Sequence, residues 1–153
     1  MGFLRVGYWR PLGGNRGDDP RDYVLPDPRT LVDVNWDSDV RSRIASYLKN
    51  GKVLAYGFDY SYCRFRCGVS DTLMGSCDFT DGVWIWPEGL HHYVEIHSVR
   101  LQNEFINHMR SHDFHPPSDL ADNNLHDAYG DEKRHTASEL YERFQKSNYG
   151  GSF

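Results

Sequence analysis

The stretch from residue 80 to residue 110 constrains the fold of this 153-residue chain more than any other part of it. It opens with the turn signal TDG at 80–82, since an aspartate side chain bonds its own backbone and glycine tolerates positive φ. Four residues that favour strands follow, Val83 to Trp86. Pro87 then ends ladder pairing but suits the first turn of a helix. The stretch therefore predicts a short strand that leads directly into a helix.

Two amphipathic helices are predicted to follow this strand. Apolar residues recur at three- and four-residue spacing, which gives each helix one inward face. The first helix is expected over 88–97, with Leu90, Tyr93, Val94 and His97 on its inward face. The second is expected over 103–111, with Phe105, Ile106 and Met109 facing inward. We therefore expect Trp86 and Leu90 to be buried.

The same stretch resembles a pattern found in small uncharacterised bacterial proteins. The motif runs TDG, WPEGL and HYV, then a histidine and VRL, over positions 80–101, and a cysteine pair precedes it. The resemblance covers roughly residues 60–106. It departs from the pattern at Gln102, where the pattern has proline, and in the wider spacing of Cys63 and Cys67. It implies a bacterial domain and no particular activity.

The whole chain predicts a single α+β domain, in which a small, mostly antiparallel sheet packs with three to four helices. Residues 1–111 form this domain, and residues 112–153 form a polar loop and a short C-terminal helix that either packs on it or is mobile. The remaining helices are expected over 38–49, capped by Asp37 or Ser38, and over 137–146. Strands are expected over 3–9, 52–60, 62–67 and 83–86.

Composition and charge exclude several classes of protein. No apolar run is long enough for a membrane span or a signal peptide, so the predicted location is cytoplasmic. With that location, three cysteines favour reduced thiols over disulfides. The formal net charge of −5 disfavours nucleic acid as a ligand and favours a basic protein as a partner.

Cys63, Cys67, His92 and His97 are the candidate metal ligands, because thiolate sulfur and imidazole nitrogen both bind zinc. Two spacing arguments oppose a zinc site. On one strand, Cys63 and Cys67 would lie about 13 Å apart, and only a turn between them would restore the site. His92 and His97 would lie about 140° apart around an ideal helix. We therefore expect no cofactor, with zinc as the alternative.

The favoured role of these residues is structural. Buried cysteines act as small apolar side chains. A buried imidazole needs a partner for at least one nitrogen. We expect His97 to bond a backbone carbonyl or an acid near Cys63 and Cys67, which would fix the end of the helix against the sheet. A metal shared with either cysteine is the alternative.

The predicted function is that of a non-enzymatic cytosolic binding protein, such as an immunity protein or an antitoxin that holds a basic protein. The chain contains no nucleophile elbow, phosphate loop or zinc-protease helix, which disfavours an enzyme. The alternative function is a zinc-binding or thiol-dependent enzyme that uses Cys63, Cys67, Cys77 and His92 or His97.

The expected binding surface follows from the aromatic content of the chain. The aromatic residues exceed what a small core buries, and those left exposed would mark a partner site. They are Trp84, Trp86, Tyr93 and the run Tyr56, Phe58, Tyr60 and Tyr62. On the strand over 52–60, the large residues at 54, 56, 58 and 60 are expected to face the core. The alternative is that these aromatic side chains are buried in the core and bind no partner, and we expect Trp86 to be buried. The residues assigned to the binding surface are Trp84, Trp86, Glu88 and Tyr93.

Overall fold

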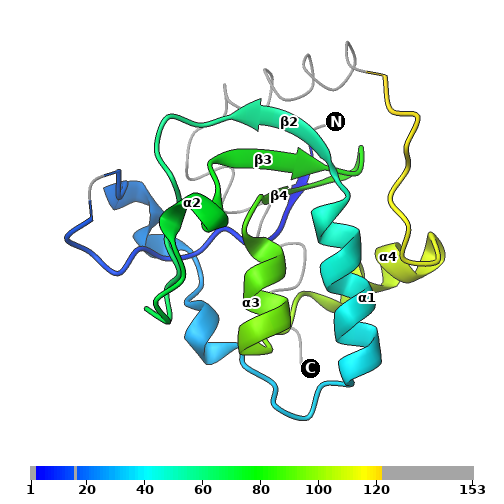
Figure 1. Cartoon of the computed structure of the whole chain (residues 1–153), viewed down its shortest axis with the longest axis horizontal. Helices are drawn as coiled ribbons and strands as arrows, with labels where there is room; N and C mark the ends of the chain where they lie inside the picture. The colour runs from blue at the N-terminus through cyan, green and yellow to red at the C-terminus, as the bar shows by residue number, and fades with distance from the viewer. Residues whose placement is uncertain (1–2, 16, 122–153) are drawn as a thin grey trace.

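The structure is a computed structural model that describes residues 3–15 and 17–121. Four strands form one mixed sheet in the order β1-β4-β3-β2, and helices pack against it, which confirms the predicted α+β class (Figure 1). The pairs β2–β3 and β3–β4 are antiparallel, and β1 runs parallel to β4. The strands are β1 (Leu4–Arg5), β2 (Lys52–Tyr56), β3 (Cys77–Thr80) and β4 (Trp84–Pro87). The helices are α1 (Ser38–Lys49), α2 (Asp71–Met74), α3 (Leu90–His97) and α4 (Asn103–Ser111), with short 3-10 helices over Pro20–Val24 and Pro28–Thr30.

Strand β4 forms the centre of the core, as its apolar sequence predicts. Trp84 and Trp86 belong to the main cluster of buried residues between the sheet and the helices. Ile85 belongs to a second, smaller cluster, together with Phe3 and Leu54. This alternation shows that β4 is buried on both faces. The indole N–H of Trp86 donates to the carbonyl oxygen of Leu48 at 3.1 Å, so its polar atom is satisfied inside the core.

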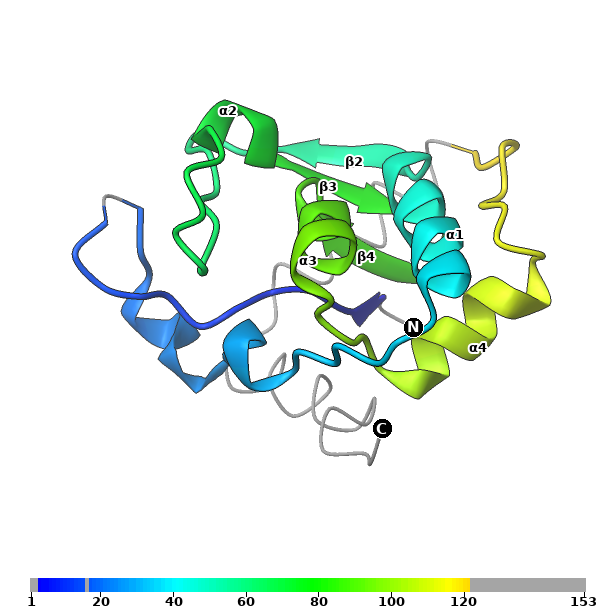
Figure 2. The same ribbon diagram turned by 60° about the horizontal axis from the view of Figure 1, so that its bottom comes forward.

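Helices α1 and α3 lie side by side against the sheet (Figures 1 and 2). Asp37 caps α1, because its carboxylate accepts the backbone N–H groups of Asp39 and Val40 at 2.9 and 3.0 Å. Leu90, at the start of α3, is fully buried, as expected. These helices cover the side of the sheet on which the two tryptophans lie.

Asp81 is a buried residue in the turn between β3 and β4, and its carboxylate contacts the turn itself, α1 and α4. One carboxylate oxygen accepts the backbone N–H groups of Val83 and Trp84 at 2.9 and 2.7 Å. The other accepts the hydroxyl of Tyr47, from α1, at 2.6 Å, and lies 3.1 Å from Nε2 of His108, in α4. The predicted turn therefore also anchors two helices.

The predicted strand over 62–67 is wrong. This segment, between β2 and α2, contains a turn in which the N–H of Arg66 donates to the carbonyl oxygen of Cys63 at 3.1 Å. Arg66 has a φ of 52°, which extended backbone does not allow. Helix α2 follows it, and neither α2 nor β3 was predicted. Short elements such as these depend more on tertiary contacts than on their own pattern.

Two predicted strands are shorter than expected. The strand over 3–9 is reduced to β1, because Gly7 has a φ of 79° and leaves the extended region. A side chain at Gly7 would also collide with Leu90, since a Cβ there would lie 2.5 Å from a methyl group of that leucine. Strand β2 ends at Tyr56 instead of residue 60. Residues 57–61 leave the sheet as an irregular segment.

Residues 112–121 contain no helix or strand, as expected for the polar loop. The helix expected over 137–146 lies outside the described residues. Among the residues that the structure describes, no helix combines the length and the apolar character needed to cross a membrane.

Candidate metal centre

Cys63, Cys67, His92 and His97 come together beside α3. Each offers one ligand atom, and these four atoms all lie within 4.8 Å of one another. Nε2 of His97 lies 3.4 Å from Sγ of Cys63, and Nε2 of His92 lies 3.4 Å from Sγ of Cys67. Around a tetrahedral zinc ion with bonds of about 2.3 Å to sulfur and about 2.0 Å to nitrogen, sulfur and nitrogen are about 3.5 Å apart. The four atoms are therefore close enough to hold a metal ion.

The two cysteines meet because the chain turns between them. The bond from the N–H of Arg66 to the carbonyl of Cys63, and the positive φ of Arg66, reverse the chain direction before Cys67. The expected separation of about 13 Å assumed an extended segment and is wrong for this reason. A turn was the one condition under which the sequence allowed a shared metal ion.

The two histidines meet although they are five residues apart on one helix. His92 lies in the first turn of α3 and His97 is its last residue. Side chains on a helix tilt toward its N-terminus, so the ring of His97 extends back toward that of His92. The ring centroids are 5.0 Å apart. The angular argument from an ideal helix ignored this tilt and the length of the imidazole side chain.

Tyr93 holds Cys63 in place from α3. Its hydroxyl donates to the carbonyl oxygen of Tyr62 at 3.1 Å and accepts the N–H of Arg64 at 3.0 Å. These two backbone groups flank Cys63 on either side. Burial raises the pKa of Tyr93 to about 12, so the hydroxyl stays protonated and able to donate. The sequence assigned Tyr93 to a binding surface, and it missed this positioning role because the segment was expected to be a strand.

The centre has a covered side and an open side. Cys63 is buried, whereas Cys67 is exposed. Phe65 stacks on the imidazole of His97, with ring centroids 4.1 Å apart and an interplanar angle of 5°. His97 therefore does lie beside the cysteine segment, as expected. Its partner is the thiol of Cys63, not the expected carbonyl or acid.

Burial shapes the protonation of the four side chains. Burial raises the pKa of the Cys63 thiol, and the neighbouring Cys67 thiol raises it further. Burial lowers the pKa of His92, as do the imidazoles of His97 and His91, and burial also lowers the pKa of His97. Neutral imidazoles keep a lone pair free to bind a metal ion. An incoming cation would therefore displace protons chiefly from sulfur.

The predicted binding surface has to be corrected for three of its four residues. Trp84, Trp86 and Tyr93 are 1%, 0% and 2% exposed, because the mixed sheet and its helices bury more aromatic area than the sequence suggested. Glu88 differs from them, since its carboxylate lines a cleft and accepts the backbone N–H groups of Ser76 and Cys77.

Cys77 is not part of the four-residue group. It lies on β3 and lines the same cleft as Glu88. Burial raises the pKa of its thiol, and the neighbouring carboxylate of Glu88 raises it further. A nucleophilic cysteine requires the opposite shift. The environment of Cys77 therefore gives no support to a thiol-dependent enzyme.

Comparisons of the chain with protein-family models, with curated proteins and with solved structures found no match. The resemblance of residues 60–106 to the bacterial pattern therefore stays a prediction. The motif behind that resemblance contains all four candidate ligands, as the cysteine pair, the histidine of HYV and the histidine that follows it.

Proposed function

We propose that this chain is a zinc-binding protein and that Cys63, Cys67, His92 and His97 hold one Zn²⁺ in a structural centre. The observation that supports this proposal most directly is the convergence of their four ligand atoms within 4.8 Å. A distance of 3.4 Å between sulfur and nitrogen also suits a thiol–imidazole hydrogen bond. Two such pairs that face each other from separate segments are better explained by one shared ion.

The ligand types favour zinc over other cations. Two sulfur and two nitrogen ligands in a tetrahedral arrangement are typical of zinc, whereas calcium and magnesium take oxygen ligands. Two thiolates would also balance the double positive charge of the ion. A neutral complex of this kind suits the buried position of Cys63.

A centre with four protein ligands leaves no position open for a substrate, so the proposed role of the metal is structural and not catalytic. The ion would link the irregular segment 61–68, which contains the two cysteines, to α3, which contains the two histidines. That segment lies beside α3 in Figure 1 and contains no helix or strand. Binding energy at such a site becomes part of the folding energy.

Metal analysis of the purified full chain tests this proposal. We expect one zinc ion per chain by elemental analysis after expression in zinc-supplied medium. Cobalt substitution should give the visible absorption of tetrahedral cobalt bound by thiolate. Cys67→Ser and His97→Gln should each reduce the metal content strongly, because each removes one ligand.

Cys77→Ser is the matched control, since Cys77 is a partly buried cysteine outside the group. It should retain full metal content. A wild-type protein that neither contains zinc nor takes it up would overturn the proposal. So would equal loss of metal in Cys77→Ser and Cys67→Ser.

A further inference from the structure

Three aromatic side chains are exposed at the end of β2 and on the irregular segment that follows it. Tyr56 and Tyr60 are 80% and 58% exposed, and Phe58 is fully exposed. Single exposed apolar residues are common on protein surfaces, but three aromatic residues within five positions form a concentrated apolar surface. We call Tyr56, Phe58 and Tyr60 the aromatic segment.

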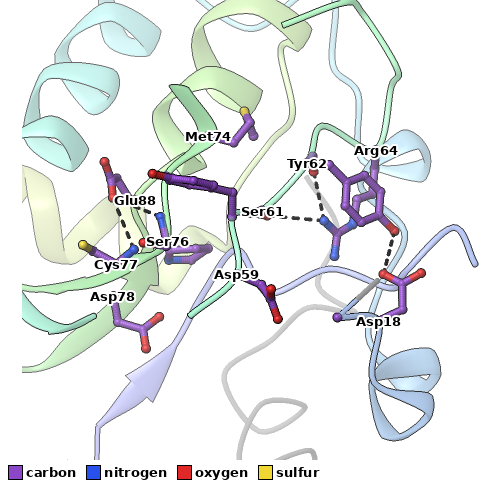
Figure 3. A pocket seen from close by; sticks show the side chains of 14 residues that line it. Asp18, Asp59, Ser61, Tyr62, Arg64, Met74, Ser76, Cys77, Asp78 and Glu88 are labelled. Carbon is purple, nitrogen blue, oxygen red and sulfur yellow. Dashed lines mark hydrogen bonds between the residues drawn. The ribbon is translucent and has the colours of Figure 1, made fainter. Parts of the chain in front are cut away.

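An acidic cleft of about 190 Å³ adjoins this segment, and Tyr60 belongs to both. Figure 3 shows the side chains that line the cleft. Four of these side chains are carboxylates, namely Asp18, Asp59, Asp78 and Glu88. Among the residues that the structure describes, Arg64 is the cation in the lining. The cleft therefore carries an excess of negative charge.

The guanidinium of Arg64 bonds neutral acceptors, and its single charge offsets one of the four carboxylates. Its guanidinium donates to the backbone carbonyls of Trp9, Arg10 and Tyr62 at 3.2, 3.2 and 2.9 Å. Asp18 instead accepts the hydroxyl of Tyr62 at 3.1 Å, and Glu88 accepts two backbone N–H groups. These donors are neutral, so they orient Asp18 and Glu88 and leave the charge of these two carboxylates in place.

We propose that the aromatic segment and the acidic cleft together dock a basic segment of a partner protein. An arginine or lysine side chain of the partner would enter the cleft and face the carboxylates. Its apolar neighbours would cover Phe58 and Tyr60, and the cation would gain further from the tyrosine ring. This surface replaces the one that the sequence assigned to Trp84, Trp86, Glu88 and Tyr93, and only Glu88 is common to both.

Charge complementarity identifies the class of partner. The carboxylate lining and the net charge of −5 repel nucleic acids and other polyanions. A cleft of about 190 Å³ has room for one long side chain. The exposed rings extend the surface beyond the cleft, so a peptide segment matches it better than a small amine does. A basic binding partner was also expected from the composition.

A nuclear magnetic resonance titration of the full chain with two synthetic peptides tests this proposal. One peptide alternates arginine with leucine, and the other carries glutamate in place of arginine. We expect the arginine peptide to shift the amide resonances of residues 56–61 and 75–78, and the glutamate peptide to shift none of them. The docking proposal does not rest on zinc. If the protein neither contains nor takes up zinc but binds the arginine peptide, only the proposed metal centre is overturned.

Substitutions at the surface sharpen this test. The double variant Phe58→Ser, Asp59→Asn should weaken binding of the arginine peptide roughly tenfold, since it removes an exposed ring and a cleft carboxylate. The control Ile96→Ser, Asp39→Asn changes an exposed apolar residue of α3 and an exposed acid of α1, and should bind like the wild type. The proposal is overturned if the arginine peptide shifts nothing at millimolar concentration, if it shifts another surface instead, or if both variants bind equally.

Discussion

The hydroxyl of Tyr93 bonds both backbone groups beside Cys63. Because the ring of Tyr93 is buried, its packing and its hydrogen bonds can be separated by one substitution. Tyr93→Phe keeps the packing and leaves the N–H of Arg64 without this partner, whereas the carbonyl of Tyr62 still accepts the guanidinium of Arg64 at 2.9 Å. Tyr93 is thus a positioning residue for the proposed centre.

We expect Tyr93→Phe to lower the free energy of unfolding by about 1–3 kcal/mol, the usual cost of an unsatisfied buried polar group. Urea denaturation of the zinc-loaded protein measures this. Competition with a chromophoric chelator should also show weaker zinc binding, which a purely structural role would not cause. Tyr60→Phe is the control and should change neither quantity, because Tyr60 is exposed.

Asp22 gives a pH-dependent prediction away from the metal ligands. Burial raises the pKa of its carboxyl, so the folded state disfavours the ionised form. Its contribution to stability is therefore least favourable above the raised pKa and recovers as the pH falls through that value. Asp22→Asn should raise the melting temperature at pH 7 and change it little at pH 3, where Asp22 is protonated in both states. A lower melting temperature of the variant at pH 7 would show that ionised Asp22 is stabilising.

At the level of elements, Asp81 connects the β3–β4 turn to α1 and α4. Asp81→Ala removes the acceptor of two backbone N–H groups, of the Tyr47 hydroxyl and of His108. We expect a loss of about 3–5 kcal/mol in the free energy of unfolding, because the donors stay buried without their charged partner. Asp39→Ala, at an exposed acid, is the control.

A double-mutant cycle tests whether Tyr47 and Asp81 act together. Tyr47→Phe should cost less in the Asp81→Ala background than in the wild type, since the bond of 2.6 Å between them is then already lost. Equal costs in both backgrounds would mean that the hydrogen bond contributes nothing of its own.

The elements that could be predicted from sequence have both a periodic pattern and a boundary residue. Helix α1 matches its prediction because Asp37 caps it and Ile44, Tyr47 and Leu48 share one face. Strand β4 follows the predicted turn. Pro87 was expected to end the ladder and open the next helix, which is wrong: it is the last residue of β4 and pairs with Asp78, and α3 begins at Leu90. Segment 62–67 has apolar residues in a strand-like order, yet its structure is set by Tyr93, some 30 positions further along. No local pattern contains that contact.

The four residues whose ligand atoms converge were named from the sequence as candidate ligands, and their spacing was used as an argument against a shared ion. Both spacing arguments treated the elements as ideal. One turn at Arg66 and the backward tilt of the His97 side chain were enough to bring the ligand atoms together. The sequence placed Tyr56, Phe58 and Tyr60 on the core-facing side of a strand, because an alternating run of tyrosine and phenylalanine is also the pattern of a buried strand. That orientation is wrong, since all three side chains are exposed.

For the whole molecule, removal of zinc should loosen one region and leave the rest folded. We expect a chelator to lower the melting temperature and to speed amide hydrogen exchange in residues 61–68 and at the C-terminal end of α3. Exchange in β3 and β4 should stay slow, because none of the four ligands lies on these strands and the strands pair with each other along their own ladder. Free zinc at about a thousand times its Kd would add about 4 kcal/mol of stability.

His97→Gln provides the control for this measurement. If zinc is bound, the chelator effect should disappear in this variant, because a ligand is already lost. Uniformly faster exchange across the sheet on chelation would mean that the metal supports the whole fold, not one segment.

The order of the ligands along the chain has a consequence for synthesis. His92 follows Cys67 by 25 positions, and His97 follows Cys63 by 34. At a translation rate of about 5–20 residues per second, the thiols of a nascent chain emerge from the ribosome about 1.5–7 seconds before His97 does. During this interval Cys63 and Cys67 are open to oxidation or to a competing metal. Zinc capture by this protein would therefore be timed by the emergence of His97.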